Sequence, residues 1–583
     1  MIGYFSPHLA GRNWSRFRYG GSLTHGRSLK HLPYFFSILN YLNPTDSCTV
    51  RARLYKLTEQ ILALPMSLLI VRLKYLCSLG FLMIGSHAAS PPNIIYILAD
   101  DLGVGDVACY NASSRWATPH LDQLAREGLR FTDAHSASGV CTPSRYTLLT
   151  GRYSWRGRLK EGVTQGYDGS LIEPGRLTVP AYLRQHGYTT AMLGKWHLGL
   201  DWVRRGPRAE EVDFAQPFGG GPLAHGFDQF YGISASLDMP PYVWLENDRA
   251  TTLPSGQTGN SPAPKLWRAG AISPDFKFEQ VQPRLTEKAI AYLTERAQAR
   301  DGKPFFLYLA LAAPHTPVLP TPEFAGKSQT TSYGDFVTQI DADVGAILAA
   351  LKKNGLAENT LVIFTADNGF APPAGLEELR RIGHDPSAGM RGFKSDLFEG
   401  GHHVPFIARW PAVTSAGTSS AALVGQLDLF ATCADLLGGS VPANAAEDSV
   451  SLLPLLRGLA PTNTTRASLV HHSVEGRFSI REGRWKLLLW PGSGGWSSPA
   501  AKPSQWLKSE VVDLSLLPPH QLYDLGADPA EKNNLAASHP EIVQRLGQLM
   551  RRTLLAGRST PGVHEPISLA HWPQADWLKD FTP

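Results

Sequence analysis

The chain has 583 residues, of which 43% are hydrophobic and 18% charged, so it can bury a large core and wholesale disorder is excluded. The formal net charge is +5, but the first 88 residues hold ten Lys and Arg against two Asp and Glu, which leaves 45 basic and 48 acidic residues in the remainder. The basic excess therefore belongs to the leader, and no nucleic-acid partner is expected.

Residues 66–88 have the layout of a secretory signal peptide. Arg72 and Lys74 precede an apolar stretch over 75–85, and small residues suit cleavage after Ala88. Because this stretch is too short to span a bilayer comfortably, we expect an exported protein (periplasmic, secreted or in a lysosome-like compartment) with no stable membrane span after processing. A membrane anchor or a buried helix is the alternative. Residues 1–65 show no periodic pattern and stay unassigned; an over-extended start codon would explain them.

Cleavage after Ala88 would leave three cysteines, Cys109, Cys141 and Cys433. This odd and sparse set indicates that disulfides do not hold the fold together and that at least one thiol is unpaired. Cys141 is the candidate for that thiol.

Beyond the leader, apolar runs alternate with helical patterns. Strands are predicted over 93–98, 188–193, 304–311 and 360–365, and helices over 120–129, 179–187 and 333–355. This alternation is typical of βαβ units, so the sequence predicts an α/β fold with a mostly parallel sheet flanked by helices.

Each predicted strand runs directly into polar residues. In open parallel sheets, ligands bind at the carboxyl ends of the strands. One such residue alone would more often belong to a solvated turn or a loop, but their position at one end of four strands indicates a functional site. The residues are Asp100, Asp101, Lys195, His197, His315, Asp367 and Asn368.

The chemistry of these groups indicates a cation and an oxyanion. The three aspartates and Asn368 offer only oxygen ligands, which suit Ca²⁺ or Mg²⁺ better than zinc. Lys195, Lys394 and Arg145 add positive charge, and the natural guest of such a pocket is a compact oxyanion such as sulfate or phosphate.

Cys141 falls at a predicted helix start, with Thr142 as the cap, Pro143 at the first helical position and Gly151 as the stop. A thiolate at this end of a helix would be activated, so a cysteine-based phosphatase or a redox site is one reading. A thiolate beside a hard cation is chemically odd, however, because sulfur prefers softer metals.

The segment "CTPSR" (141–145) matches the C-x-P-S-R core of the type I, formylglycine-dependent sulfatase signature, and "LLTGRY" matches its continuation. The blocks "ILADDLGVGD", "GKWHLG", "APHTP", "TADNG" and "GFKSDLFEGG" follow the family's order over most of 91–411, and the C-terminal "LYDLGADPAEKNNLA" is a weaker match. The chain thus resembles the type I sulfatases, and within them arylsulfatase A and N-acetylgalactosamine-6-sulfatase relatives.

This resemblance implies an alkaline-phosphatase-like catalytic domain over 89–460 and a smaller C-terminal α+β domain over 461–583. In the latter, the sequence predicts a hairpin over 477–490 with its turn near Glu482-Gly483, and an amphipathic helix over 540–554. The hairpin would belong to an antiparallel sheet packed by that helix.

The resemblance also implies roles for individual residues. A maturation enzyme would oxidise Cys141 to Cα-formylglycine, whose hydrate would be the nucleophile, beside one Ca²⁺ ion. The implied cation ligands are Asp100, Asp101, Asp367, Asn368 and the modified residue 141. Arg145 and Lys195 would orient the formylglycine. The sulfate would be bound by Lys195, Lys394 and Ser236 (or its neighbour Ser234). His315 would protonate the leaving alcohol, and His197 would be the base that releases sulfate. His403 departs from the family, since many relatives carry arginine there.

The substrate is expected to be a sulfated carbohydrate, with a galactose- or galactosamine-type 6-sulfate as the leading choice, or an aryl sulfate. The insertion over 202–283 and nearby loops offer candidate contacts, namely Asp238, Tyr242, Trp244, His384 and Arg391. Two alternatives stay open: a phosphatase or phosphodiesterase of the same fold, and a non-catalytic binder of sulfated glycans in which Cys141 is never converted.

Overall fold

A computed structural model describes residues 90–460, 465–500, 502–507 and 511–582. The chain from Ser90 onward forms one compact unit. The predictions for 1–65 and for the signal peptide at 66–88 lie outside the described residues. Within the described ranges, no helix combines the length and the apolar character needed to cross a bilayer.

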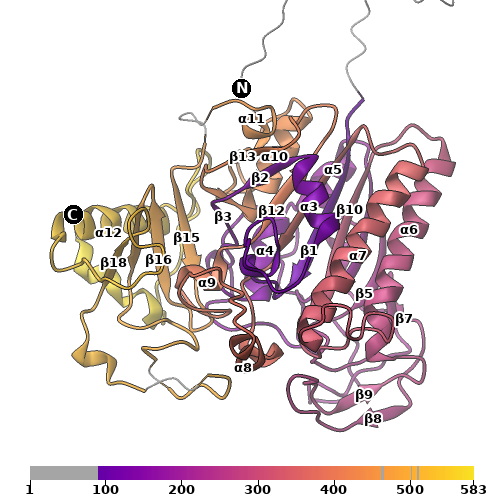
Figure 1. The fold of residues 1–583 in the computed structure, drawn as a ribbon, viewed down its shortest axis with the longest axis horizontal. Coiled ribbons are helices and arrows are strands. Elements are labelled where there is room, and N and C mark those ends of the chain that lie inside the picture. Colours follow the sequence, from indigo (N-terminus) through magenta and orange to yellow (C-terminus); the bar gives the residue numbers. More distant parts are fainter. Residues whose placement is uncertain (1–89, 461–464, 501, 508–510, 583) are drawn as a thin grey trace, which may run out of the picture. The chain divides into compact units, whose positions relative to one another are not determined.

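A ten-stranded sheet forms the centre of this unit, and all four predicted strands are confirmed in it (Figure 1). Five neighbouring strands run parallel, and their order is β11 (Thr360–Ala366), β1 (Asn93–Asp100), β10 (Phe305–Pro314), β4 (Thr189–Lys195) and β5 (Gln229–Ile233). On one side β12 (Phe406–Arg409) pairs antiparallel with β11, followed by β2 (Leu129–Phe131) and β13 (Thr418–Ser420). On the other side lie β6 (Leu245–Glu246) and β7 (Arg249–Ala250).

Helices cover both faces of this sheet because alternate side chains of β1 point to opposite sides. Ile95 and Ile97 pack with α3 (Pro119–Arg126), α6 (Val281–Ala299) and α7 (Ser332–Lys353), and α6 and α7 lie side by side in Figure 1. Ile94 and Tyr96 pack with α4 (Cys141–Thr150), α5 (Val179–Gln185) and α10 (Leu429–Leu436). The three predicted helices are confirmed as α3, α5 and α7, whereas α6 was not predicted.

The C-terminal part contains a small antiparallel sheet, whose strands are β15 (Ser468–His472), β16 (Phe478–Glu482), β17 (Trp485–Leu488) and β18 (Gln521–Asp524). The helix α12 (Pro540–Leu555) packs against it through Leu546 and Met550 (Figure 1). The predicted hairpin and amphipathic helix are thereby confirmed, and so is the fold class. The division at residue 460 stays a prediction.

The remaining strands and α-helices of the described chain are short. These are β3 (Ala134–His135), β8 (Gly256–Thr258), β9 (Gly270–Ile272), β14 (Val424–Gly425), α8 (Leu376–Arg381), α9 (Glu399–His402) and α11 (Leu453–Leu456). Two of them are close in sequence to predicted site residues. His135 in β3 precedes Cys141 by six residues, and α9 begins five residues after Lys394.

Candidate active site

The carboxyl ends of β1 and β11 bring four oxygen-bearing side chains together. Asp100 ends β1, and the Asp101 backbone N–H donates a 3.1 Å hydrogen bond to Asp367 Oδ1, just past β11. Asp101 has a left-handed backbone (φ 63°), which turns the chain at the end of the strand. These residues and Asn368 are at most 1% exposed.

The Asn368 amide shows what this cluster lacks. Its Nδ2 donates to Asp101 Oδ1 at 2.7 Å, but its buried Oδ1 has no hydrogen-bond partner among the described residues. A buried carbonyl oxygen without a partner is costly, and a hard cation is a ligand that would satisfy it. Asp100, Cys141 and Asp367 also offer ligand atoms within 4.8 Å of one another. The donor set therefore fits Ca²⁺ or Mg²⁺.

Three positive side chains surround the carboxylates. Lys195, at the end of β4, places its Nζ 2.8 and 2.7 Å from the two oxygens of Asp100. Arg145, fully buried in α4, donates from Nε and Nη2 to Asp367 Oδ2 at 3.0 and 2.7 Å. Lys394 Nζ lies 2.8 Å from the Asp101 carboxylate. The site thus holds buried charges of both signs in close pairs.

These charges act differently on two of the carboxyls. Burial alone would raise the pKa of Asp100, but Lys195, His315 and Arg145 together outweigh it and hold that pKa well below its usual range. Burial, aided by the neighbouring Asp100 charge, raises the pKa of Asp367 despite Arg145. A bound cation would relieve the repulsion between the two carboxylates.

Cys141 is the first residue of α4, and its side chain is buried. The helix starts earlier than predicted: Val140 is the N-cap, and Thr142 Oγ1 donates to the His197 carbonyl oxygen at 3.1 Å instead of capping. The predicted stop is confirmed, since Gly151 is left-handed (φ 65°). Burial raises the pKa of the Cys141 thiol against the lowering effect of Lys195 and Lys394. A thiolate nucleophile is therefore disfavoured at neutral pH.

The two predicted catalytic histidines differ in their hydrogen bonds. His197 Nε2 donates to the Thr164 carbonyl oxygen at 2.8 Å, which leaves its buried Nδ1 without a partner among the described residues. Burial, with Lys195 and Arg145, lowers the His197 pKa well below its usual range, so the ring is neutral at physiological pH. His315 Nδ1 donates to the Thr316 carbonyl oxygen at 2.5 Å.

The structure distinguishes the two candidate serines. Ser236 Oγ accepts a 3.1 Å hydrogen bond from Lys195 Nζ and lies 3.1 Å from His315 Nε2, which is itself 3.3 Å from Asp101 Oδ2. The Ser234 hydroxyl has no such contact. Ser236 is therefore the serine that joins the cluster.

Sequence reasoning missed the residues that hold Lys394 in place. The next two residues, Ser395 and Asp396, are bound by the C-terminal Gly- and Ser-rich loop: the Trp496 N–H donates to Asp396 Oδ1 at 2.8 Å. A Cβ on Gly495 would lie 2.5 Å from the Ser395 carbonyl oxygen, so only glycine allows this close approach. No local signal in the sequence indicated that this loop contacts the Lys394 segment.

The candidate substrate contacts from the insertion and nearby loops all take part in other interactions within the protein. Trp244 and Tyr242 lie in the hydrophobic core and Asp238 pairs with Arg268 at 2.6 Å. His384 pairs with Asp106 at 2.7 Å, and Arg391 donates to the Glu531 and Ser498 carbonyl oxygens. The prediction that Trp244 and Tyr242 contact substrate is wrong, because strand and loop aromatics here fill the core.

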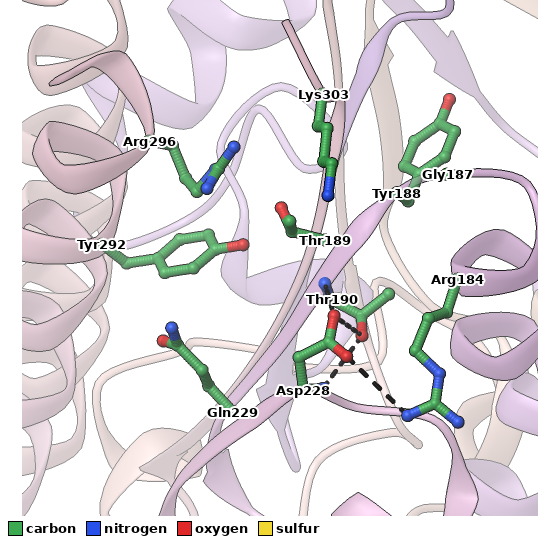
Figure 2. A pocket seen from close by; sticks show the side chains of 10 residues that line it. All are labelled: Arg184, Gly187, Tyr188, Thr189, Thr190, Asp228, Gln229, Tyr292, Arg296 and Lys303. Atoms are coloured by element: carbon green, nitrogen blue, oxygen red, sulfur yellow. Dashed lines mark hydrogen bonds and ion pairs between the residues drawn. The ribbon is translucent and has the colours of Figure 1, made fainter. Parts of the chain in front are cut away.

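A separate hollow of about 360 Å³ lies at the opposite end of β4 from Lys195. Figure 2 shows it lined by Thr189, Thr190, Tyr292 and Lys303. Arg184 Nη1 lies 3.7 Å from Asp228 Oδ1 in the same hollow. It includes none of the strand-end carboxylates. The candidate site is therefore the polar cluster and not this hollow.

The cluster of oxygen ligands lies at the carboxyl ends of the strands of an alkaline-phosphatase-like sheet, with two lysines and an arginine around it. This arrangement is typical of a hydrolase of oxyanion esters. The sulfatase family model matches residues 92–440. The chain therefore belongs to the sulfatase family and is a sulfuric ester hydrolase.

Individual relatives match most of the chain. It is 35% identical over 497 residues to an N-acetylgalactosamine-6-O-sulfatase of Bacteroides thetaiotaomicron, covering 79% of this chain and 92% of that one. It is 36% identical over 477 residues to human arylsulfatase A, covering 80% and 88%. A solved Bacteroides thetaiotaomicron structure, labelled 6S-sulf and described under the metabolism of multiple glycosaminoglycans, superposes with a TM-score of 0.69 at 34% identity, covering 80% and 99%.

Proposed function

We propose that this sulfatase removes sulfate from a sulfated saccharide, with a formylglycine derived from Cys141 and a bound Ca²⁺ ion. The observation that carries the proposal is an all-oxygen cluster with an unpartnered Asn368 Oδ1, beside a buried thiol whose raised pKa makes it a poor nucleophile. When present, the hydrated aldehyde supplies a nucleophilic hydroxyl and the cation supplies fixed positive charge for a sulfate oxygen.

The chain's own residues would hold these groups. Asp100, Asp101, Asp367 and Asn368 would bind the cation together with the modified residue 141. Arg145 also donates to the Lys195 carbonyl oxygen at 3.0 Å, which ties the helix that carries Cys141 to the end of β4. This contact supports a role for Arg145 in orienting residue 141.

Sulfate would lie between Lys195, Lys394 and Ser236. Both lysines now pair with carboxylates that the cation would bind, so their ammonium protons become available to sulfate oxygens when the cation is present. Ser236 adds a hydroxyl between Lys195 and His315. These groups would bind a tetrahedral oxyanion at fixed positions.

Proton transfer would fall to the two histidines. His197 is neutral, its Nδ1 has no partner among the described residues, and its carbonyl oxygen accepts from Thr142, the neighbour of residue 141, so this ring can accept a proton. His315, whose side chain is 7% exposed, turns its Nε2 toward Ser236 and can donate a proton to the leaving alcohol at the open side of the site. Asp101 Oδ2 lies 3.3 Å from this nitrogen.

The proposal has three further parts. The substrate is a saccharide, residues 66–88 act as a signal peptide for export, and a formylglycine-generating enzyme converts Cys141. The names of two relatives, an N-acetylgalactosamine-6-O-sulfatase and an N-acetylgalactosamine-6-sulfatase, support 6-sulfated N-acetylgalactosamine as the first substrate to test.

The test compares sulfate and phosphate esters of the same alcohols with matured protein. The alcohols should include 4-nitrophenol, N-acetylgalactosamine at its 6-hydroxyl and, as the positional control, the same sugar at its 4-hydroxyl. Sulfate ester turnover should exceed phosphate ester turnover, and the 6-sulfate should react faster than the 4-sulfate. Faster cleavage of phosphate esters would overturn the proposal in favour of a phosphatase of the same fold.

A further inference from the structure

A second cluster of metal-ligating side chains lies outside the proposed active site. His135 in β3, His402 at the end of α9 and His471 in β15 are all 0% exposed. One ring nitrogen of each lies within 4.8 Å of the others. Three histidines from segments more than 60 residues apart in sequence thus meet in the protein interior, and the proposed sulfatase chemistry uses none of them.

Hydrogen bonds on the outer side of two rings indicate where their lone pairs point. His402 Nε2 lies 3.0 Å from the Leu397 carbonyl oxygen, and His135 Nε2 lies 2.8 Å from Asp133 Oδ1. With each Nε2 donating its proton to the neighbouring oxygen, each Nδ1 keeps its lone pair. The two Nδ1 atoms face each other at 3.1 Å.

Two facing lone pairs at this distance repel each other unless a proton or a cation lies between them. A metal-free arrangement would move one proton to an Nδ1, with Lys486 or Arg481 donating to the vacated Nε2 at 3.1 or 3.0 Å. This arrangement uses the third N–H of Lys486, which also bonds to Glu399 and Glu531 at 2.9 Å each, or the second Nη1 N–H of Arg481, which also pairs with Asp133. The metal-free arrangement also leaves the buried Nε2 of His471 without a partner.

We propose that His135, His402 and His471 form a zinc site. Neutral imidazole is a preferred ligand of Zn²⁺, and metal-bound histidines commonly donate their other N–H to a carboxylate or a backbone carbonyl, as His135 and His402 do here. Three nitrogen ligands leave the fourth tetrahedral position to a solvent molecule. The His402 and His471 rings, now stacked with centroids 3.7 Å apart, must splay to converge on the ion.

The surrounding charges are compatible with a dication. Three carboxylates face two positive side chains around the rings, namely Asp133, Glu399 and Glu531 against Arg481 and Lys486. Burial lowers the pKa of all three histidines, that of His135 to about 4, so the rings are neutral and free to bind metal at physiological pH.

The ion would join three separate segments. His135 lies six residues before Cys141 and His402 eight residues after Lys394, while His471 belongs to the small C-terminal sheet. The backbone N–H of Gly139 already donates to the His472 carbonyl oxygen at 3.0 Å. Zinc would therefore connect the C-terminal sheet to both segments that lead to the site, and this inference is independent of the proposed function.

The test is the zinc content of the full, matured chain after incubation with Zn²⁺ and dialysis against zinc-free buffer, measured by mass spectrometry of the metal. Wild type should retain about one zinc ion per chain, and His471→Ala should retain less than about a tenth of that. His225→Gln is the matched control, because His225 is also buried but bonds to Ser170 at 3.1 Å, outside the cluster. It should retain zinc as wild type does.

The variant Cys141→Ser distinguishes zinc at the histidine cluster from zinc at the proposed active site. We expect Cys141→Ser to retain zinc as wild type does. Loss of zinc from Cys141→Ser with retention by His471→Ala would overturn the proposal, and so would a wild type that emerges from dialysis without zinc. Cobalt(II) gives a second readout that does not depend on the alanine variant: wild type loaded with Co²⁺ should show the visible absorption of a tetrahedral nitrogen site. Absorption of an octahedral oxygen site alone would contradict it.

Discussion

Replacing His315 by alanine should separate leaving-group protonation from every other role of the site. The Nδ1 of this ring bonds to the Thr316 carbonyl oxygen, so Nε2 is the nitrogen that reaches the substrate side, where it lies 3.1 Å from Ser236 Oγ. General acid catalysis contributes about 10²–10⁴-fold, which at 1.36 kcal/mol per tenfold corresponds to about 2.7–5.4 kcal/mol of activation free energy.

That loss should depend on the alcohol that leaves. A sugar hydroxyl needs a proton as it departs, so His315→Ala should lower kcat on a saccharide sulfate by the full ~10²–10⁴-fold. 4-Nitrophenolate departs readily without a proton, so kcat on 4-nitrophenyl sulfate should fall by less than about tenfold. His225→Gln, a buried histidine outside the site, should leave both rates unchanged.

The assay is initial-rate turnover of the two esters by wild type and variant, with circular dichroism to establish that the variant is folded. Equal losses on both esters would refute the reasoning, because they would mean that His315 positions sulfate and does not protonate the leaving group.

Two further predictions concern stability and the cation. Asp448→Ala leaves the buried Arg156 without the carboxylate that pairs with it at 2.8 Å, so urea denaturation should show an unfolding free energy lower by about 3–5 kcal/mol; a change below about 1 kcal/mol would contradict this. Despite burial, Arg156 and the hydrogen bonds around it lower the Asp448 pKa, so this stabilisation is present above pH ~4 and should disappear as falling pH protonates the wild-type carboxyl. Chelation with EGTA should abolish turnover, and added Ca²⁺ should restore it. Asn368→Ala should require more Ca²⁺ than wild type for the same turnover. Full turnover after exhaustive chelation would contradict a cation in the site.

The sequence was sufficient for the strands and for the polar residues at their ends, because buried parallel strands are continuous apolar runs and their carboxyl ends must meet. It was less reliable where several local patterns compete. Thr142 and Pro143 are typical of a helix start, yet α4 begins at Cys141, and Thr142 bonds to the His197 carbonyl oxygen instead of capping the helix. Ser236 and Ser234 differ only in contacts that the fold creates.

The sequence could not predict contacts between segments that are distant along the chain. The loop around Trp496 binds Asp396, one hundred residues earlier, and no local pattern predicts this contact. The paired histidines at 402–403 and 471–472 are visible in the sequence, yet only the packing of β15 against α9 and β3 brings three imidazoles together. His403, noted as a departure from the family, lies 3.3 Å from Glu399 and so belongs to the surroundings of that cluster.

The central claim is that residue 141 acts as an aldehyde and not as a thiol. Mass spectrometry of the peptide that contains Cys141, from protein expressed with a formylglycine-generating enzyme, tests it directly. The peptide should be about 18 Da lighter than the thiol form, since oxygen replaces SH and H, and it should react with a hydrazide probe. A protein that hydrolyses sulfate esters while its Cys141 peptide keeps the mass of the thiol and does not react with the probe would contradict the claim.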